Sequence, residues 1–381
     1  MKIDDKTSHN SPSIRFPEFT GEWKNTTLEE CVDFLDGQRK PIKSDDRKGE
    51  KRLYPYYGAS GIIDYIDEYI FDGDYILLSE DGANIIDRNY RVAFIANGKI
   101  WVNNHAHVLQ PHKEMNINFL SEALERINYA IYNTGTTMPK LNQEICRKIN
   151  LNVPSLSEQN KIGNLLYLLN ERIATQNRLI EDLKKLRCAI VEKMFKQSKA
   201  NGRLGDFIEQ VSVRNKNGLY SNVLSVSNKQ GFVKQSEQFE DRTVASEDTS
   251  NYKIVKRNNF AYNPARINVG SIARLTKFDV GIVSPMYVCF RTKASIIPEY
   301  MEAFFTSQQF FYEMMKRLEG SVRLCLSYEG LCNIPVYIPD MNKQIAMGQN
   351  ISLILSKIGL EIEYLGRLHQ QKQYLLRKMF I

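Results

Sequence analysis

An internal repeat constrains this chain more than any other feature of its sequence. When the 381-residue sequence is shifted against itself by 185 positions, residues 135–195 align with 320–380 without a gap. Thirteen of the 61 aligned positions are identical, well above chance matching, and both segments end in Lys-Met-Phe. The chain is therefore one unit written twice, with a variable segment followed by a shared module.

The shared module has the pattern of a long helix. Its first copy opens with Pro154, Ser155 and Glu158, which fit a proline followed by an S-x-x-E capping box, and the second copy offers Asp340 as the N-cap. Apolar residues then recur at alternating steps of four and three, which predicts a coiled-coil seam along helices of roughly 40 residues, about 60 Å long. The predicted seam positions are Ile162, Leu166, Leu169, Ile173, Gln176, Ile180, Leu183, Arg187, Ile190 and Met194 in the first copy, and Met347, Ile351, Ile354, Ile358, Glu361, Leu365, Leu368, Lys372, Leu375 and Met379 in the second.

Polar residues interrupt both seams at equivalent places and predict how the helices pair. An antiparallel pairing about a pseudo-two-fold axis sets Arg187 opposite Glu361 and Gln176 opposite Lys372. A parallel pairing in register would set Arg187 against Lys372, which is a like-charge contact. We therefore expect an antiparallel intramolecular coiled coil whose polar positions fix the register. The alternative is that the two helices are core helices of separate domains.

The two variable segments read as mixed α and β structure. Each contains short runs of β-branched and aromatic residues separated by turn signals such as DGD and ANGK, followed by a helical stretch. The expected fold class is α+β, with two mixed α/β domains separated by the two long helices. The expected divisions are a loose tail 1–14, a first domain 15–152, a central helix 153–198, a second domain 199–337 and a C-terminal helix 338–381.

Composition excludes several classes of protein. No run approaches the 18 apolar residues of a membrane span, and the polar start does not read as a secretory signal. The six cysteines are scattered without a CxxC pair, so neither a disulfide framework nor a zinc finger is expected. These features predict a cytoplasmic protein with no membrane association.

Motifs for enzyme chemistry are missing from the sequence. It has no G-x-x-x-x-G-K-[ST] loop and no G-x-G-x-x-G turn, and no pair of carboxylates has a spacing that marks it as catalytic. His105 and His107 share a face of a presumed strand, but no further Cys or His lies nearby, which favours packed histidines over a metal site. We therefore expect a binding protein with no catalytic residue, metal or cofactor of its own.

Double-stranded DNA suits two related domains held apart by a helical spacer, because two reading surfaces can contact two half-sites. The net charge of +7 permits this partner without demanding it, since a solvated surface gives similar counts. Basic side chains can contact phosphates, and Arg and Asn can bridge guanine and adenine edges. The candidate DNA contacts are Arg39, Lys40, Lys43, Arg47, Asn84, Arg88 and Arg91 in the first domain, and Arg214, Lys216, Asn263, Arg266 and Asn268 in the second.

The whole layout resembles the specificity subunit of type I restriction-modification systems. The resemblance rests on the lead-in RFPEFTGEW at 15–23, the P-x-x-x-E/K-Q start of each long helix and the two KMF endings. It implies that each variable domain reads one half of a bipartite DNA target, and that the helices set the spacing.

The same resemblance implies the partners. Two methyltransferase subunits and restriction translocase-nuclease subunits would join the chain, and S-adenosylmethionine, ATP and Mg would be held by those partners. The alternatives are a non-catalytic coiled-coil scaffold that binds protein partners only, and a free-standing enzyme with an unrecognised site.

Overall fold

The chain forms two compact units. The computed structural model describes residues 11–47, 51–196, 199–228, 230–235, 248–321 and 323–381, so most of the predicted tail 1–14 lies outside the described residues. The first unit comprises the described residues through Asn177 together with Tyr364–Ile381, and the second comprises Arg178–Glu363. Each long helix therefore gives one half to each unit.

The first unit is built around a six-stranded sheet with the order β2-β7-β5-β6-β3-β4. Its neighbouring strands are antiparallel except β3 and β6, which are parallel, and β1 and β8 form a separate antiparallel pair. The strands are β1 Lys24–Thr27, β2 Val32–Phe34, β3 Tyr54–Gly58, β4 Gly61–Ile66, β5 Phe71–Ser79, β6 Ala93–Val102, β7 Ala106–Pro111 and β8 Asn150–Val153.

Alternation along β5 shows how both faces of this sheet are covered. Successive side chains of a strand point to opposite faces. Ile76 and Leu78 join one core cluster with Leu120 of helix α2, whereas Leu77 joins a second cluster with Val108. The helices of this part are α1 Asn84–Asp87, α2 Ile117–Glu125 and α3 Gln143–Arg147, with 3₁₀ turns η1 Leu28–Glu30, η2 Asp36–Gln38, η3 Ser44–Asp46 and η4 Tyr129–Tyr132.

The second unit contains two four-stranded sheets, with orders β10-β17-β14-β15 and β12-β11-β16-β13, and the short pair β18-β9. Only β11 and β16 pair in parallel among these described strands. The strands are β9 Gly202–Arg203, β10 Ile208–Val211, β11 Val223–Ser227, β12 Gly231–Lys234, β13 Lys253–Lys256, β14 Phe260–Tyr262, β15 Ile272–Arg274, β16 Val280–Val283, β17 Val288–Thr292 and β18 Pro335–Val336. The shorter helices are α5 Leu204–Phe207, η5 Ile267–Val269, α7 Pro298–Phe305, α8 Gln308–Met315 and α9 Tyr328–Cys332.

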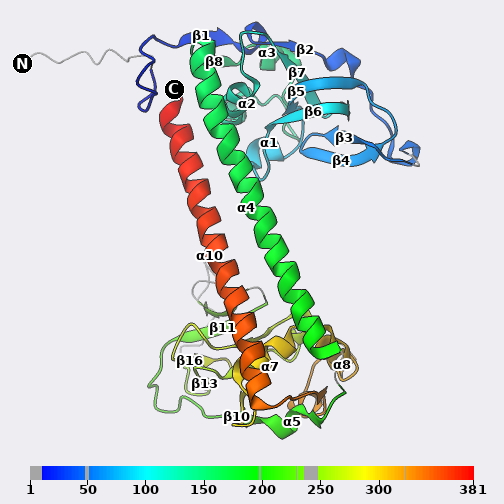
Figure 1. Ribbon diagram of the computed structural model, residues 1–381, viewed down its shortest axis with the longest axis vertical. Coiled ribbons are helices and arrows are strands. Elements are labelled where there is room, and N and C mark those ends of the chain that lie inside the picture. Colours follow the sequence, from blue (N-terminus) through cyan, green and yellow to red (C-terminus); the bar gives the residue numbers. More distant parts are fainter. Residues whose placement is uncertain (1–10, 48–50, 197–198, 229, 236–247, 322) are drawn as a thin grey trace, which may run out of the picture. The chain divides into compact units, whose positions relative to one another are not determined.

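The two predicted long helices are present as α4 Leu156–Lys196 and α10 Met341–Met379 (Figure 1). Within the first unit, Ile162 and Leu166 near the start of α4 pack with Leu376 and Met379 near the end of α10, so the helices run antiparallel there. Every predicted seam position of both helices is buried or half-buried. The α+β fold class and the helix pairing are confirmed, while the predicted domain limits stay a prediction.

The N-caps form as the sequence predicts, with one difference. The Ser155 hydroxyl accepts from the Glu158 backbone N–H at 3.4 Å, and the Asp340 carboxylate accepts from the Lys343 N–H at 3.0 Å. The Glu158 carboxylate does not complete the expected capping box. Both of its oxygens accept from the Arg15 guanidinium at 2.7 Å, which ties the lead-in segment to the helix.

A buried glutamine ties the start of each long helix to its domain. The Gln159 Oε1 accepts from the Asn116 N–H at 2.9 Å, and its Nε2 donates to the carbonyl of Pro154 at 3.0 Å. Gln344 holds the equivalent repeat position and accepts from the Ile297 N–H at 3.0 Å. Its amide donates to the proline carbonyl five residues earlier at 3.0 Å. The identity of Gln159 and Gln344 in the repeat is therefore explained by their equivalent hydrogen bonds.

The KMF ending of each copy packs into the domain of the other copy. Phe380, at the end of the second copy, stacks on Phe119 of α2 with ring centroids 5.1 Å apart and contacts Trp23 edge-on. Phe195, at the end of the first copy, packs on Tyr300 of α7 at 5.3 Å. Each domain therefore has the start of its own helix and the end of the other copy's helix in its core.

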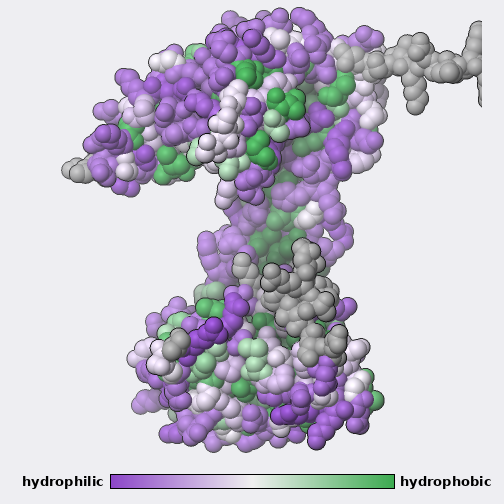
Figure 2. All heavy atoms as spheres, turned by 180° about the vertical axis from the view of Figure 1, so that it is seen from behind, coloured by the Kyte–Doolittle hydropathy of each residue, from purple (hydrophilic) through white to green (hydrophobic). Residues whose placement is uncertain are grey.

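Polar side chains cover most of the first unit on the face shown in Figure 2, interrupted by small hydrophobic patches. Among the described segments, no helix combines the length and apolarity needed to span a membrane.

Candidate nucleic-acid interface

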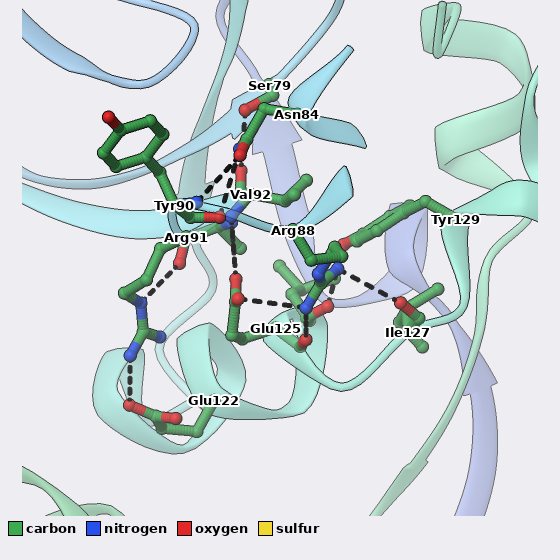
Figure 3. A network of polar contacts seen from close by, with 12 residues as sticks. Ser79, Asn84, Arg88, Tyr90, Arg91, Val92, Glu122, Glu125, Ile127 and Tyr129 are labelled. Atoms are coloured by element: carbon green, nitrogen blue, oxygen red, sulfur yellow. Dashed lines mark hydrogen bonds and ion pairs between the residues drawn. The ribbon is translucent and has the colours of Figure 1, made fainter. Parts of the chain in front are cut away.

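The loop that follows β5 in the first unit carries three of the expected DNA contacts. Asn84 closes this loop, because its Nδ2 donates to the Tyr90 carbonyl at 3.1 Å and its Oδ1 accepts from the Tyr90 N–H at 2.8 Å (Figure 3). Helix α1 ends at Arg88, whose backbone is left-handed with φ 56°. The side chain of Tyr90 is left 67% exposed at the tip of the loop.

Two arginines fix this loop to α2. Arg88 pairs with Glu125 at 2.9 Å, and Arg91 pairs with Glu122 at 2.7 Å (Figure 3). The second oxygen of Glu125 accepts from the N–H of Val92 at 2.9 Å. Burial raises the pKa of Glu122, but the nearby cations outweigh this and hold the pKa below its usual range. Both guanidinium groups are therefore engaged inside the domain, where they position the loop.

A second loop lies against the first one. Residues 134–140, which we call the first shared loop, contain the start of the ungapped repeat at Gly135. The N–H of Leu141 donates to the Glu80 carbonyl at 2.7 Å, and the N–H of Gly82 donates to the Pro139 carbonyl at 3.0 Å. Met138, at the tip of the shared loop, is 60% exposed. The two loops together form one exposed surface.

The second unit has the same arrangement after β14. The loop 263–271 is folded by Asn263, whose Oδ1 accepts from the Ala265 N–H at 3.1 Å and whose side chain is buried. Arg266 is exposed and Asn268 is half-buried. The N–H of Leu326 donates to the Pro264 carbonyl at 3.1 Å. Residues 319–325, the second shared loop, thus lie beside a variable loop, as in the first unit.

The basic stretch of the first domain divides into anchored and exposed side chains. Arg39 pairs with Glu80 at 2.7 Å and donates to the Ala106 carbonyl at 2.8 Å, so its charge is neutralised within the domain. Arg47 lies over the Tyr56 ring at 4.6 Å. The side chains of Lys40 and Lys43 are exposed.

Arg214 and Lys216 lie in an exposed loop of the second unit. Arg214 donates to the Asn251 side chain at 2.9 Å. Lys216 follows the buried Asn215, which holds the loop by donating to the Tyr220 carbonyl at 2.8 Å. The role of all twelve candidate residues in DNA contact stays a prediction.

His107 lies in a cluster of charged side chains beside the loop that follows β5, which we call the first variable loop. Its Nδ1 is 2.6 Å from Asp36 and its Nε2 is 2.9 Å from the Leu141 carbonyl. Burial lowers its pKa, but hydrogen bonds to Asp36 and Cys146 raise the pKa to about 10. Asp36, Glu80 and His107 could approach one metal ion, but Arg39 already binds both carboxylates. The cluster is satisfied as a network of charged side chains. His105, which shares the predicted face, instead pairs with Asp81.

The seam cation Lys372 binds an acidic residue of the first domain. Its Nζ is 3.1 Å from Glu122 of α2, which also accepts from Arg91 and from Asn170 of α4 at 2.8 Å. These residues line a cleft between the domain and the two helices. One buried carboxylate therefore joins the domain to both long helices.

Arg187 holds the equivalent repeat position and faces an equivalent group. It lies close enough to Glu302 of α7 to lower the pKa of that carboxyl, although burial is the larger effect and leaves the pKa raised. Glu302 also pairs with Arg274 at 2.9 Å, and all three residues line a second cleft. Glu361 pairs with Lys357 on its own helix. The predicted Arg187–Glu361 and Gln176–Lys372 pairings stay predictions.

Comparison with known families gives a match that covers the first copy of the repeat. Residues 20–185 match the family described as the type I restriction modification DNA specificity domain. This part of the chain is therefore similar to type I DNA specificity domains. The resemblance inferred from the sequence is confirmed.

Related proteins carry the same assignment. A Haemophilus influenzae protein assigned as a type I restriction enzyme specificity subunit is 35% identical over 145 residues, 38% of this chain and 36% of that protein. The specificity subunit of the Escherichia coli type I restriction enzyme EcoprrI is 28% identical over 154 residues, 40% of this chain and 37% of that protein. The matched segments thus span little more than a third of these relatives.

A solved structure shows the same fold over nearly the whole chain. The S subunit of a type I restriction-modification system from M. genitalium has a TM-score of 0.66 at 17% identity, covering 97% of this chain and 99% of that one. The second half of the chain therefore shares the architecture of that S subunit.

Several exposed residues of these loops were not predicted from the sequence. Tyr90, Lys140 and Arg323 lie in or beside the two shared loops, with exposed side chains. For Lys140 and Arg323 a signal was present, because both lie inside the ungapped repeat that starts at Gly135 and Gly320. No pattern in the sequence distinguishes Tyr90 from the other tyrosines.

Proposed function

We propose that this chain is the non-catalytic DNA-recognition subunit of a type I restriction-modification system. Each unit supplies one recognition surface, so the target is bipartite and asymmetric. The proposal rests on the specificity-domain match over 20–185 together with the S-subunit fold of the whole chain.

One structural observation carries the proposal. In each unit a loop that differs between the copies is hydrogen-bonded to a loop that the copies share, through the N–H of Leu141 or Leu326. Two homologous domains that present different loops at equivalent places suit two different half-sites.

The charges of the candidate residues suggest two roles. Arg39, Arg88 and Arg91 are bound to carboxylates of their own domain and support the first variable loop. Within the described part of the chain, four candidates have cationic ends with no bound partner and suit phosphate or base contact. These are Lys40, Lys43, Lys216 and Arg266.

The expected partners follow from the same proposal. Two methyltransferase subunits would bind the chain and hold S-adenosylmethionine, and restriction translocase-nuclease subunits would add ATP and Mg. This chain would direct both activities to the target in the cytoplasm. Exposed apolar residues along the long helices, such as Leu168, Leu353 and Leu360, are suited to such protein contacts.

Base-resolution methylation mapping tests the proposal. DNA from cells that express this chain with its neighbouring methyltransferase is compared with DNA from cells that lack only this chain. We expect a two-part motif with a fixed unspecified gap to gain adenine methylation only when this chain is present. Exchanging residues 20–152 for the same region of a relative should then change one half of the motif alone.

A catalytically inactive methyltransferase serves as the control for background modification. If the partner is active and no methylated motif depends on this chain, the proposed function is wrong. A scaffold that binds only protein partners would then be the better account, and it would show little salt-dependent affinity for duplex DNA.

A further inference from the structure

The two shared loops both carry a glycine that leaves no room for a side chain, inside two domains that otherwise differ. Gly135 and Gly320 hold equivalent repeat positions. A Cβ at Gly135 would collide with the carbonyl of Met138, and a Cβ at Gly320 would collide with the carbonyl of Arg323, three residues later in each case. Gly320 also has φ 118°, which favours glycine. The repeat therefore preserves a close approach of the backbone to this glycine in both loops.

Backbone hydrogen bonds join the first and last residues of each loop, and an equivalent buried leucine follows each loop. The Thr134 N–H donates to the Lys140 carbonyl at 2.9 Å, and Glu319 and Cys325 exchange two backbone hydrogen bonds at 2.9 and 2.8 Å. Leu141, at the base of the first loop, is fully buried, and so is its counterpart in the second unit. The loops are thus presented on a rigid base.

The tips of the loops carry hydrogen-bond donors that have no partner in the described part of the chain. Thr136 and Thr137 are exposed in the first loop, and Ser321 and Arg323 are exposed in the second, where residue 322 lies outside the described residues. Hydroxyl and guanidinium groups of this kind bind phosphate oxygens well. Thr136 and Ser321 hold equivalent repeat positions, so both loops place an exposed hydroxyl at the same place.

The position of the loops indicates what these donors contact. Each shared loop lies beside a variable loop, through Glu80 in the first unit and Pro264 in the second. Two domains that read different bases still meet the same sugar-phosphate backbone, so the parts that they have in common suit contacts that carry no sequence information.

We propose that the two shared loops are DNA phosphate clamps, in which Thr136, Thr137, Ser321 and Arg323 bind backbone phosphates flanking each half-site. This inference rests on the proposed function. It assigns affinity to the shared loops and leaves base selection to the loops that follow β5 and β14.

Binding measurements on the full chain with its methyltransferase partner test the clamps. Two variants remove the donors with little change of shape, namely Thr136→Val with Thr137→Val, and Arg323→Gln. Thr20→Val and Lys185→Gln are matched controls on exposed residues outside the loops. Fluorescence anisotropy is recorded over a salt series with a duplex that contains the mapped motif and with an unrelated duplex.

Each loop variant should weaken both duplexes by a similar severalfold factor, and Arg323→Gln should reduce the salt slope by about 1. The controls should bind like the wild type, and the methylated motif should stay the same. Unchanged affinity in both loop variants overturns the inference, and so does a loss confined to the motif duplex, since that result would make the loops base readers. If the wild type itself binds no DNA and methylates no motif, the proposed function fails and the clamps fail with it.

Discussion

His107 shows how a single buried residue makes the stability of the first unit depend on pH. Burial disfavours its charge, but the hydrogen bond to Asp36 raises its pKa to about 10 from the ordinary 6.5. A group whose pKa is higher in the folded state contributes its full stability below the unfolded pKa and loses it as pH rises through the folded value. The contribution of His107 is therefore complete below about pH 6.5 and fades toward pH 10.

Substitution of His107 or Asp36 should weaken the dependence of stability on pH. We expect the wild-type free energy of unfolding to fall by about 1–2 kcal/mol between pH 6.5 and pH 8 relative to His107→Gln. Asp36→Asn should remove the same slope, because His107 loses the anion that holds its proton. Denaturant unfolding at a series of pH values measures this, and parallel curves for all three proteins would show that His107 is uncharged.

The two repeat glutamines offer a second residue-scale prediction. Gln159→Leu leaves the Asn116 N–H and the Pro154 carbonyl without their partner, and Gln344→Leu does the same in the second unit. Each substitution should cost about 1–3 kcal/mol, because a buried polar group left unpaired keeps its full desolvation penalty. Urea unfolding measures the loss, with the exposed Gln349→Leu as the control. If the free energy of unfolding falls no more than it does in Gln349→Leu, these buried hydrogen bonds do not stabilise the chain.

Element-scale patterns were the most predictable part of this chain. The seam positions and the caps at Ser155 and Asp340 follow from helical spacing and local hydrogen bonding, and the structure has them. The partners of Arg88 and Arg91 were not predictable, because Glu125 and Glu122 come from a helix more than 30 residues away in the sequence. Local patterns identify which residues are basic, but only the fold shows which charges are neutralised.

Double-mutant cycles on the long helices separate the predicted register from the observed contacts. Lys372→Ala and Glu122→Gln should couple by about 0.5–3 kcal/mol, since their buried groups are 3.1 Å apart. Arg187→Ala should couple with Glu302→Gln in the same sense. Thermal or denaturant unfolding of single and double variants gives the coupling energies. Additive losses for Lys372 and Glu122 would contradict the contact, and strong coupling of Arg187 with Glu361 would support the predicted register.

At the scale of the whole molecule, the repeat makes each domain depend on a segment distant in sequence. Phe380→Ala should destabilise the first unit and Phe195→Ala the second, by about 3–5 kcal/mol each, because each ring leaves a cavity in an aromatic core. Hydrogen exchange measured by mass spectrometry should show lost protection around Phe119 for the first variant and around Tyr300 for the second. The two variants serve as controls for each other. A loss of protection spread evenly over both units would contradict the placement of each helix end in the core of the other copy's domain.

The whole-molecule layout of two domains and two helices was visible in the sequence because it is repeated, but the sheets were not. Over the described residues, the main sheet of the first domain has six strands, whereas the second domain has two four-stranded sheets. Strand pairing is set by contacts between residues distant in the chain, such as β3 with β6, which short alternating runs do not encode.

The equivalent closing contacts at Gln159, Gln344, Phe195 and Phe380 have a genetic consequence. A crossover within the shared module would exchange a domain while keeping these four residues at the helix ends. Under the proposed function, such a recombinant gene would encode a chain with a new pair of recognition surfaces. The repeat would thus allow one domain to be replaced without a change in the residues at the helix ends that hold it.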